Sequence, residues 1–340
     1  MRIALVSNDF EFRIKDGISR YSYELYNYLK KNNEIYLYTF KEVARNFLSN
    51  VSLGIERIFG TKIDNSVDIV HVLYPNAIFP ITKKPVVVTW HDADVFTRYK
   101  ASPFSPRFYH WLGVVLPAFR NTKRSNGIVY VSEETKYEVD KYIRKYSNKD
   151  YAIVPNGIDQ AFIDAKVKRG VERRDFVFVG SVHFAHKNVH FLIRSFVEAS
   201  PKDNDLYIFT PTEESKIPKE FFNYKNVHII IKAQTEEIID KLSKSIALLH
   251  FSKLEGFGYP ILEAMALGTP VVVLKDANIP KITTKYAIKI DEADATKTII
   301  KLAQEKPELS DEAIKYAKSF SWERSARETE AFYKKILNQK

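Results

Sequence analysis

The stretch EGFGYPILEAMALGTPVVV, residues 255–273, is the most informative part of the sequence. Pro260 suits the first turn of a helix, where its fixed φ helps and its missing N–H leaves no hydrogen bond unmade. The residues after it favour a helix, and Gly268 followed by Pro270 indicates where that helix ends. The valines at 271–273 then begin a buried strand. Such a succession of glycine turn, short helix and strand is typical of α/β proteins.

The same stretch contains a candidate ligand site. The backbone amides of 256–259 lie just before the expected helix, where free amides and the helix dipole attract anions. Gly256 and Gly258 let a ligand approach the backbone without a Cβ in the way. Glu263 is expected in the first helical turn, and its carboxylate can accept two hydrogen bonds from a ribose diol. The pattern suggests a nucleotide or nucleotide-sugar site, but a glycine loop with a glutamate that merely complements the dipole fits as well.

Composition indicates a globular protein with room for two domains. The chain has 340 residues, 45% of them hydrophobic and 28% charged, as in soluble globular proteins. The absence of cysteine excludes disulfides, thiolate chemistry and thiolate metal sites, and fits a reducing compartment. Residues 1–6 run straight into a strand pattern without the apolar core of a signal peptide, and no uncharged apolar window is long enough to span a membrane. We expect a cytoplasmic protein.

The net charge of +10 is spread along the chain. A basic surface could meet anionic lipid, a polyanionic acceptor or nucleic acid, but there is no paired Cys/His spacing and no aromatic run of the RNP type, so no nucleic-acid partner is expected. The segment 104–124 mixes aromatic and basic side chains, which suits peripheral contact with an anionic membrane. An ordinary helix packed on a sheet explains it too, and we favour that interpretation.

Short β-branched runs alternate with amphipathic stretches, which is typical of parallel βαβ units. The expected strands are 3–7, 35–38, 69–72, 86–89, 128–131, 152–154, 176–179, 206–209, 227–231, 246–250 and 271–274. The expected helices are 18–31, about 106–121, 133–146, 189–198, 236–243, 261–267, 293–304, 311–319 and 322–337. We predict two doubly wound α/β domains with a cleft between them, and ligands at the carboxyl ends of the strands.

With the strands placed, the loops after them resemble the retaining glycosyltransferases of family 4, which have the GT-B fold of two Rossmann-like domains. Glu255 and Glu263 resemble the E-x7-E signature of that family. Further stretches match in the expected order: 17–25, 87–92, 131–133, 154–159, 178–181 with 187–188, and 320–323. The resemblance covers essentially the whole chain.

The resemblance implies three parts of the chain. Residues 1–165 are the expected acceptor-side domain and 166–319 the donor-side domain, with the charged segment 166–174 as the linker candidate. Residues 320–340 resemble the closing helix that returns to the first domain.

The family's donor-binding residues fall on the opening stretch. In this resemblance Glu263 holds the ribose hydroxyls and Glu255 the hydroxyls of the donor sugar. The amides of Gly256, Phe257 and Gly258 contact the phosphate and the sugar. The donor is a nucleotide diphosphate sugar, and no other cofactor is implied.

The resemblance places the residue that neutralises the leaving diphosphate in the loop after the strand 176–179. Lys187 is implied to neutralise it, and a fixed cation there accelerates the departure of the leaving group. Ser181 stands in the donor site where many relatives carry an arginine, so neutralisation leans on Lys187 or on another cation. Gly17 is implied to bring backbone close to the donor phosphate.

On the acceptor side, His91 ends a strand and matches the family's histidine beside the reacting sugar. A lone histidine is more often structural, so this role rests on the resemblance. Asp16 stands where the family often has glycine, and it could reshape the acceptor side. Arg20 is a candidate contact for an acidic acceptor, or simply part of a charged helix face.

Two patterns imitate metal sites. Asp92-Ala93-Asp94 is a D-x-D triplet, but such triplets arise by chance in a chain rich in acids. His183, His186 and His190 have a zinc-like spacing without a nearby carboxylate or thiolate. We expect no metal site.

The function expected from this resemblance is a retaining, metal-independent hexosyltransferase. It would move a sugar from a nucleotide diphosphate sugar to a hydroxyl of a glycan, a lipid-linked acceptor or another glycoconjugate. An epimerase or a phosphorylase of the same fold is an alternative. A basic polyanion-binding protein with a vestigial sugar site is another. The sequence names neither the base, the sugar nor the acceptor.

Overall fold

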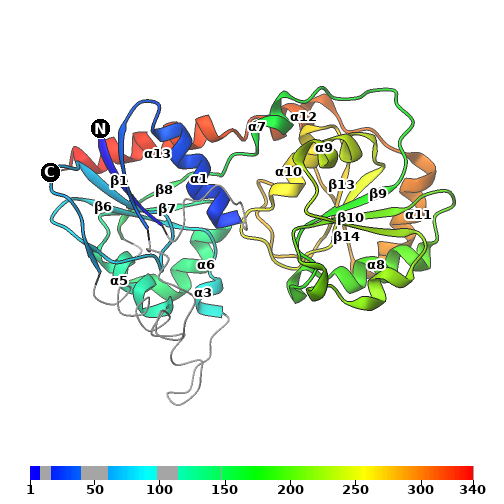
Figure 1. Cartoon of the computed structure of the whole chain (residues 1–340), viewed down its shortest axis with the longest axis horizontal. Helices are drawn as coiled ribbons and strands as arrows, with labels where there is room; N and C mark the ends of the chain where they lie inside the picture. The colour runs from blue at the N-terminus through cyan, green and yellow to red at the C-terminus, as the bar shows by residue number, and fades with distance from the viewer. Residues whose placement is uncertain (8–16, 40–59, 98–113, 147, 340) are drawn as a thin grey trace, which may run out of the picture. The chain divides into compact units, whose positions relative to one another are not determined.

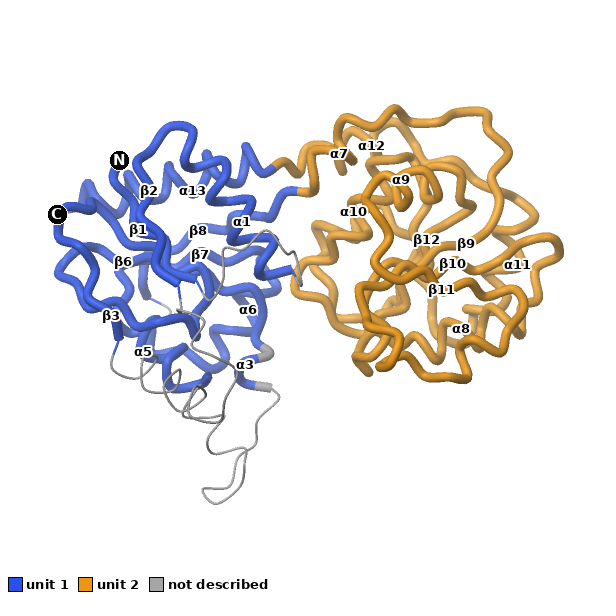
Figure 2. Tube along the Cα trace, viewed as in Figure 1, with its two compact units in different colours: residues 1–157, 322–340 blue, residues 158–321 orange. Residues whose placement is uncertain are grey.

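The computed structural model describes residues 1–7, 17–39, 60–97, 114–146 and 148–339, and Asp16 lies outside them. The chain forms two compact units (Figure 2). Unit 1 comprises 1–157 and 322–340, and unit 2 comprises 158–321. Each unit is built around a six-stranded sheet whose recorded strand pairs are all parallel. The predicted doubly wound α/β architecture is confirmed.

Unit 1 has the strand order β2-β1-β4-β6-β7-β8. Its strands are β1 (Arg2–Val6), β2 (Glu34–Tyr38), β4 (Ile69–Val72), β6 (Val86–Trp90), β7 (Gly127–Tyr130) and β8 (Asp150–Ile153), with a separate pair β3 (Thr61–Lys62) and β5 (Pro80–Ile81). Its helices are α1 (Gly17–Leu29), α3 (Asp94–Thr97), α5 (Leu116–Arg124), α6 (Glu133–Ile143), the short turn η2 (Arg144–Tyr146) and α13 (Trp322–Leu337). In Figure 1, α1 and α13 lie on one side of this sheet, and α3, α5 and α6 lie on the other.

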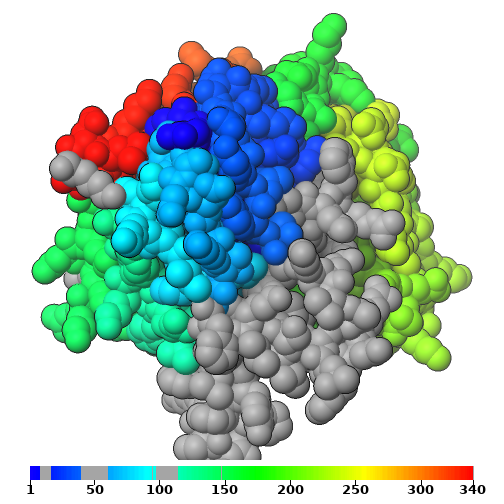
Figure 3. Space-filling view, turned by 60° about the vertical axis from the view of Figure 1, so that its left-hand side comes forward, coloured from blue at the N-terminus to red at the C-terminus, as the bar shows by residue number. Residues whose placement is uncertain are grey.

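The last helix, α13, packs beside α1 in unit 1. Figure 3 shows it in red next to the dark blue N-terminal residues. Gly127 permits this close approach, since a Cβ there would lie 2.7 Å from Phe332 and 2.8 Å from Ile336. Ser325 adds a hydrogen bond to the carbonyl of Pro155. Helix α13 is therefore part of the core of unit 1.

Unit 2 has the strand order β11-β10-β9-β12-β13-β14. Its strands are β9 (Phe176–Val179), β10 (Leu206–Thr210), β11 (Val227–Ile231), β12 (Ala247–His250), β13 (Val271–Leu274) and β14 (Ile288–Ile290). Its helices are α7 (Gln160–Asp164), α8 (Val189–Ala199), α9 (Thr235–Lys244), α10 (Tyr259–Ala266), α11 (Ala295–Glu305) and α12 (Asp311–Lys318). Its short 3-10 turns are η3 (Ala185–Lys187), η4 (Glu214–Lys216), η5 (Lys219–Asn223) and η6 (Glu292–Asp294).

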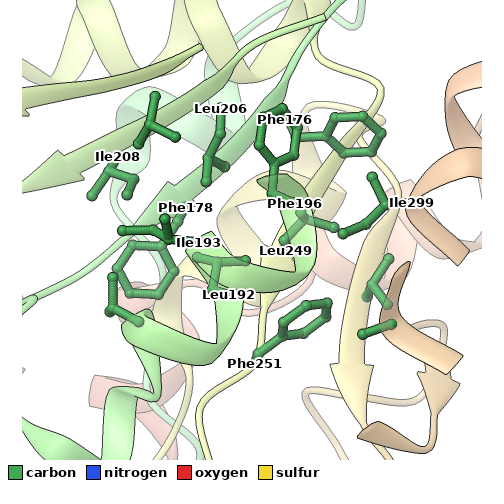
Figure 4. Close-up of a cluster of buried hydrophobic side chains, with 14 of the residues drawn as sticks. Phe176, Phe178, Leu192, Ile193, Phe196, Leu206, Ile208, Leu249, Phe251 and Ile299 are labelled. Carbon is green, nitrogen blue, oxygen red and sulfur yellow. The ribbon is translucent and has the colours of Figure 1, made fainter. Parts of the chain in front are cut away.

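Two hydrophobic layers sandwich the sheet of unit 2. One layer joins the strands to α8 and α11, and Figure 4 shows Leu192, Phe196 and Ile299 packed against strand residues. The other layer joins the strands to α9, α10 and α12. The strands β12 and β13 are buried on both faces, which is why they appear in the sequence as continuous apolar runs rather than alternating ones.

The charged segment 166–174 packs on unit 2 instead of spanning between the units. Arg173 is 2% exposed, and its guanidinium donates to the carbonyls of Ser245 and Gly268 at 2.9 Å each. Lys168 pairs with Asp240. The units therefore divide between Gly157 and Ile158, before the segment that the charge pattern favoured as the linker.

Candidate functional site

The strand order of unit 2 creates a switch point between β9 and β12. From β9 the chain runs outward through β10 to β11, and it returns on the other side through β12, β13 and β14. The two neighbouring strands pair in parallel, with Leu248 opposite Val177. In open parallel sheets, the connections after two such strands diverge and leave a crevice at their carboxyl ends, where ligands bind. Any polar side chains that follow β9 and β12 are therefore site candidates.

Lys187 and Glu255 meet at this switch point. Lys187 ends the turn η3 after β9, and Glu255 lies in the loop after β12. The Nζ atom of Lys187 lies 2.7 Å from Oε1 and 2.8 Å from Oε2 of Glu255. Their side chains are only 17% and 11% exposed. The structure thus brings together two predicted site residues that are far apart in the sequence.

A third residue, which the sequence motifs did not indicate, completes this cluster. His250, the last residue of β12, is fully buried, and its Nε2 lies 2.9 Å from Oε1 of Glu255. A signal existed in the sequence, because a polar residue ends the apolar strand just before the glycine loop.

The surroundings of Glu255 favour its charged form. Burial by itself would raise the pKa of its carboxyl, but the ammonium of Lys187 and the hydrogen bond from His250 outweigh that effect. Together they hold the pKa of Glu255 far below its usual range. The cluster is therefore a carboxylate and a cation side by side. Chemically, a carboxylate can accept hydrogen bonds from hydroxyls, and a cation can pair with negative charge.

Backbone hydrogen bonds fix the loop that carries Glu255. Its own N–H donates to the carbonyl of Asn278 at 3.0 Å, and the N–H of Asn278 donates to Lys253 at 2.9 Å. The N–H of Lys253 in turn donates to the carbonyl of His186 at 2.8 Å. The loops after β9, β12 and β13 are thus tied to one another, and the positions of Lys187 and Glu255 are set by the sheet.

Helix α10 begins at Tyr259, one residue before Pro260, and Pro260 lies in its first turn as the sequence predicted. Gly258 precedes it in a left-handed conformation, φ 90°, which glycine adopts without strain. Glu263 therefore lies in the second helical turn and not in the first. It is 5% exposed, and the helix dipole, which acts on the first turn, does not account for it. A carboxylate this deep in a protein usually serves a specific partner.

The glycine loop itself is folded against the core of unit 2. Phe257 is 4% exposed, and its ring packs edge-on against Tyr259 and Phe320. Gly256 is half-buried. The side chain of Phe257 anchors the loop to the core of unit 2.

Ser181 is tied to the loop after β10. Its hydroxyl lies 2.9 Å from the hydroxyl of Thr212 and 2.8 Å from Nδ1 of His183. The N–H of Val182 also donates to Thr212. Thr212 thus holds the position of Ser181, and no local motif in the sequence marked it.

In unit 1, His91 follows β6 and is 6% exposed. Its Nε2 lies 2.9 Å from the carbonyl oxygen of Leu73, and since a carbonyl only accepts, this nitrogen carries the proton. The ring of Tyr21 stands edge-on to it, with centroids 4.5 Å apart. Gly17 is exposed at the start of α1, and Arg20 is half-buried on the same helix. These candidates belong to unit 1 and the others to unit 2.

The histidines of the zinc-like pattern each contact a neighbouring side chain. Among the described residues, no group of three or more His, Cys, Asp or Glu side chains is placed to hold an ion. His183 contacts Ser181, His186 stacks on Phe184, and His190 meets the ring of Phe221.

Only part of the aromatic and basic segment 104–124 lies within the described residues. That part includes α5, where Asn121 is buried and donates to the carbonyls of Pro75 and Ala77. Arg120 lies over the ring of Phe79. Across the described parts of the chain, no helix combines the length and apolar character needed to cross a membrane.

Both halves of the chain match known families. Residues 159–320 match the family model of glycosyl transferases group 1, and residues 15–162 match the family model of glycosyltransferase family 4. The O-antigen chain mannosyltransferase RfbU of Salmonella typhimurium strain LT2 is 27% identical over 179 residues, which are 51% of this chain and 49% of that protein. The match therefore spans about half the length of this relative.

Two solved structures share the fold. The sucrose-phosphate synthase (tll1590) of Thermosynechococcus elongatus has a TM-score of 0.71 at 12% identity, over 100% of both chains. The pneumococcal O-GlcNAc transferase GtfA, solved with UDP and GlcNAc, has a TM-score of 0.56 at 15% identity, over 79% of this chain and 57% of that one.

Proposed function

Because this chain has the GT-B fold and both its halves match glycosyltransferase family models, we propose that it is a retaining glycosyltransferase. It moves a sugar from a nucleotide diphosphate sugar to a hydroxyl of a glycan or lipid-linked acceptor. No metal ion takes part. The relative's name makes mannose the first sugar to test.

The observation that carries this proposal is the Lys187–Glu255 pair at the switch point of unit 2. A diphosphate needs a fixed cation, and Lys187 is held at the carboxyl end of β9, where such ligands bind. A donor sugar needs acceptors for its hydroxyls, and Glu255 is kept ionised beside it. The amides of Gly256–Gly258 and the buried Glu263 supply the remaining contacts, to the phosphate and to the ribose.

In the proposed reaction the bond between C1 of the sugar and the diphosphate oxygen breaks. The acceptor oxygen bonds to C1 on the face that the leaving group vacates, and the hydroxyl proton passes to the departing phosphate. Lys187 stabilises the charge that builds on the diphosphate, which is worth several kcal/mol in comparable sites. We assign His91 the role of contacting the reacting sugar, and the carbonyl of Leu73 fixes the orientation of its ring.

A thermal-shift screen with UDP, GDP and ADP sugars tests the donor class. A ligand that binds only the folded state raises the melting temperature, so one base series is expected to stabilise the protein. Transfer to an acceptor with EDTA present is the second arm, and it should proceed undiminished. Stabilisation by none of the donors would overturn the proposal.

Product analysis without acceptor separates the alternatives. An epimerised nucleotide sugar would replace the proposal with an epimerase, and turnover that requires free phosphate would replace it with a phosphorylase. Salt-dependent nucleic-acid binding without donor binding would favour the polyanion-binding alternative.

A further inference from the structure

Within the described part of the chain, His250 has one polar contact, and that contact fixes its tautomer. Its Nε2 lies 2.9 Å from a carboxylate oxygen of Glu255, which can only accept, so Nε2 carries a proton. Its Nδ1 is buried and has no hydrogen-bond partner among the residues that the structure describes. A second proton on Nδ1 would be a buried donor without an acceptor, which is costly. The geometry therefore fits a neutral imidazole that donates to Glu255.

The two oxygens of Glu255 are occupied unequally. Oε1 accepts from both His250 and Lys187, at 2.9 and 2.7 Å. Oε2 accepts from Lys187, at 2.8 Å, and from no other residue that the structure describes. Each carboxylate oxygen has two lone pairs, so Oε1 is saturated and Oε2 retains an acceptor site. The atom that can receive a ligand hydroxyl is Oε2.

A bound diphosphate competes with Glu255 for Lys187. As the ammonium turns to the phosphate oxygens, Glu255 loses its strongest stabilising charge while it remains buried. Among the described residues, Lys187 and His250 are the titratable groups that act on this carboxyl. His250 cannot follow the ligand, since it lies at the end of β12 and is fully buried.

From this arrangement we propose that His250 is a positioning residue for the donor: it holds Oε1 of Glu255 so that Oε2 faces the donor sugar when Lys187 engages the diphosphate. The proposal rests on the donor site proposed above. It assigns His250 no contact with the substrate itself.

Three substitutions at 250 separate positioning from mere packing. His250→Leu fills the position with an apolar side chain of similar bulk and removes the N–H that donates to Glu255. His250→Gln places an amide N–H near the position of Nε2, whereas His250→Asn is shorter and places it near Nδ1. Donor affinity is measured by calorimetry with the best nucleotide sugar from the screen. We expect a loss of about tenfold or more for Leu and Asn, as for a hydrogen bond to a charged group, and recovery for Gln to within about threefold of wild type.

The pH profile of donor affinity is a readout that a packing role would not move. In the wild type Glu255 stays ionised. Protonation of this group should therefore not weaken donor binding between about pH 5 and pH 8. Without the His250 hydrogen bond the pKa of Glu255 rises. The pH at which affinity begins to fall should therefore be higher for His250→Asn and His250→Leu than for the wild type and His250→Gln.

A matched control lies in the same unit. His228 on β11 donates to Asp205 at 2.8 Å, but this pair is exposed to solvent. His228→Leu should leave donor affinity and its pH profile unchanged. Equal loss in the 228 and 250 variants would overturn the positioning role, as would a Gln variant no better than Asn.

Glu255→Gln tells the two proposals apart. If it leaves donor affinity unchanged, the donor site itself is misassigned. If it weakens the donor while all three 250 variants bind like wild type, the donor site stands and the role of His250 is refuted. Should His250→Leu fail to fold, the donor affinities of His250→Gln and His250→Asn are compared instead.

Discussion

His71 on β4 and Tyr333 on α13 share a buried hydrogen bond, with Nδ1 2.5 Å from the tyrosine hydroxyl. Nε2 of His71 lies 2.7 Å from Oγ1 of Thr89, and the same Oγ1 lies 3.0 Å from the hydroxyl of Tyr21. All four side chains are at most 1% exposed. The chain of hydrogen bonds joins α1, β4, β6 and α13 through the core of unit 1, and it ends at the ring that packs on His91.

The first prediction concerns acid stability. Burial, assisted by the charge of His91, lowers the pKa of His71 to about 3 from 6.5. Between these values the unfolded chain binds a proton that the folded chain excludes. The contribution of His71 to stability is therefore complete above pH 6.5 and falls by about 1.4 kcal/mol per pH unit toward pH 3.

Urea unfolding of the wild type and of His71→Gln at several pH values checks this. The variant lacks the titrating group, so its deficit in unfolding free energy should shrink as the pH falls below 6.5. Parallel pH curves for the two proteins would contradict the prediction.

Tyr333→Phe is expected to destabilise unit 1. The substitution removes one hydroxyl and leaves a nitrogen of His71 buried without its partner, which costs about 1–3 kcal/mol. Tyr137→Phe is the control, since that ring is 67% exposed on α6. Equal unfolding free energies for the two variants in urea would show that the buried hydrogen bond contributes nothing.

The sequence predicted the local elements well where a residue type dictates the backbone. Gly268 adopts φ 78° at the end of α10, as the Gly–Pro stop signal implied. Helix α10 starts one residue before Pro260 because the left-handed Gly258 marks the entry to the helix. Strand β14 was missed because it has three residues, two of them exposed, and so shows no apolar run.

Local sequence patterns could not predict which residues of the site contact one another. Lys187 and Glu255 are neighbours only because β12 pairs with β9, and strand order is a property of the whole sheet. The role of His250 depends on the same pairing. The charged segment 166–174 was mistaken for a linker because a run of charged residues is typical of a solvent-exposed segment. In the structure, however, Arg173 is buried and donates to backbone carbonyls.

Lys187→Met should weaken binding of a nucleoside diphosphate far more than that of the monophosphate. The variant removes the cation and leaves Glu255 as an uncompensated buried charge that repels phosphate. We expect a loss of about tenfold or more for the diphosphate and about 10²-fold or more in turnover. Calorimetry with both nucleotides checks the ratio. Lys301→Met on α11, where the lysine is 65% exposed, is the control. Equal losses for the two nucleotides would place Lys187 away from the diphosphate.

Glu263→Ala should abolish discrimination between ribose and deoxyribose. If the carboxylate of Glu263 accepts hydrogen bonds from the ribose diol, the wild type should bind a 2′-deoxynucleotide about tenfold more weakly than the ribonucleotide, since one hydrogen bond to a charged group is lost. The variant should bind both equally and weakly. Glu305→Ala, an exposed glutamate on α11, should retain the preference. A Glu263→Ala protein that still prefers the ribonucleotide would assign the ribose to another side chain, and the burial of Glu263 in α10 would then serve the fold alone.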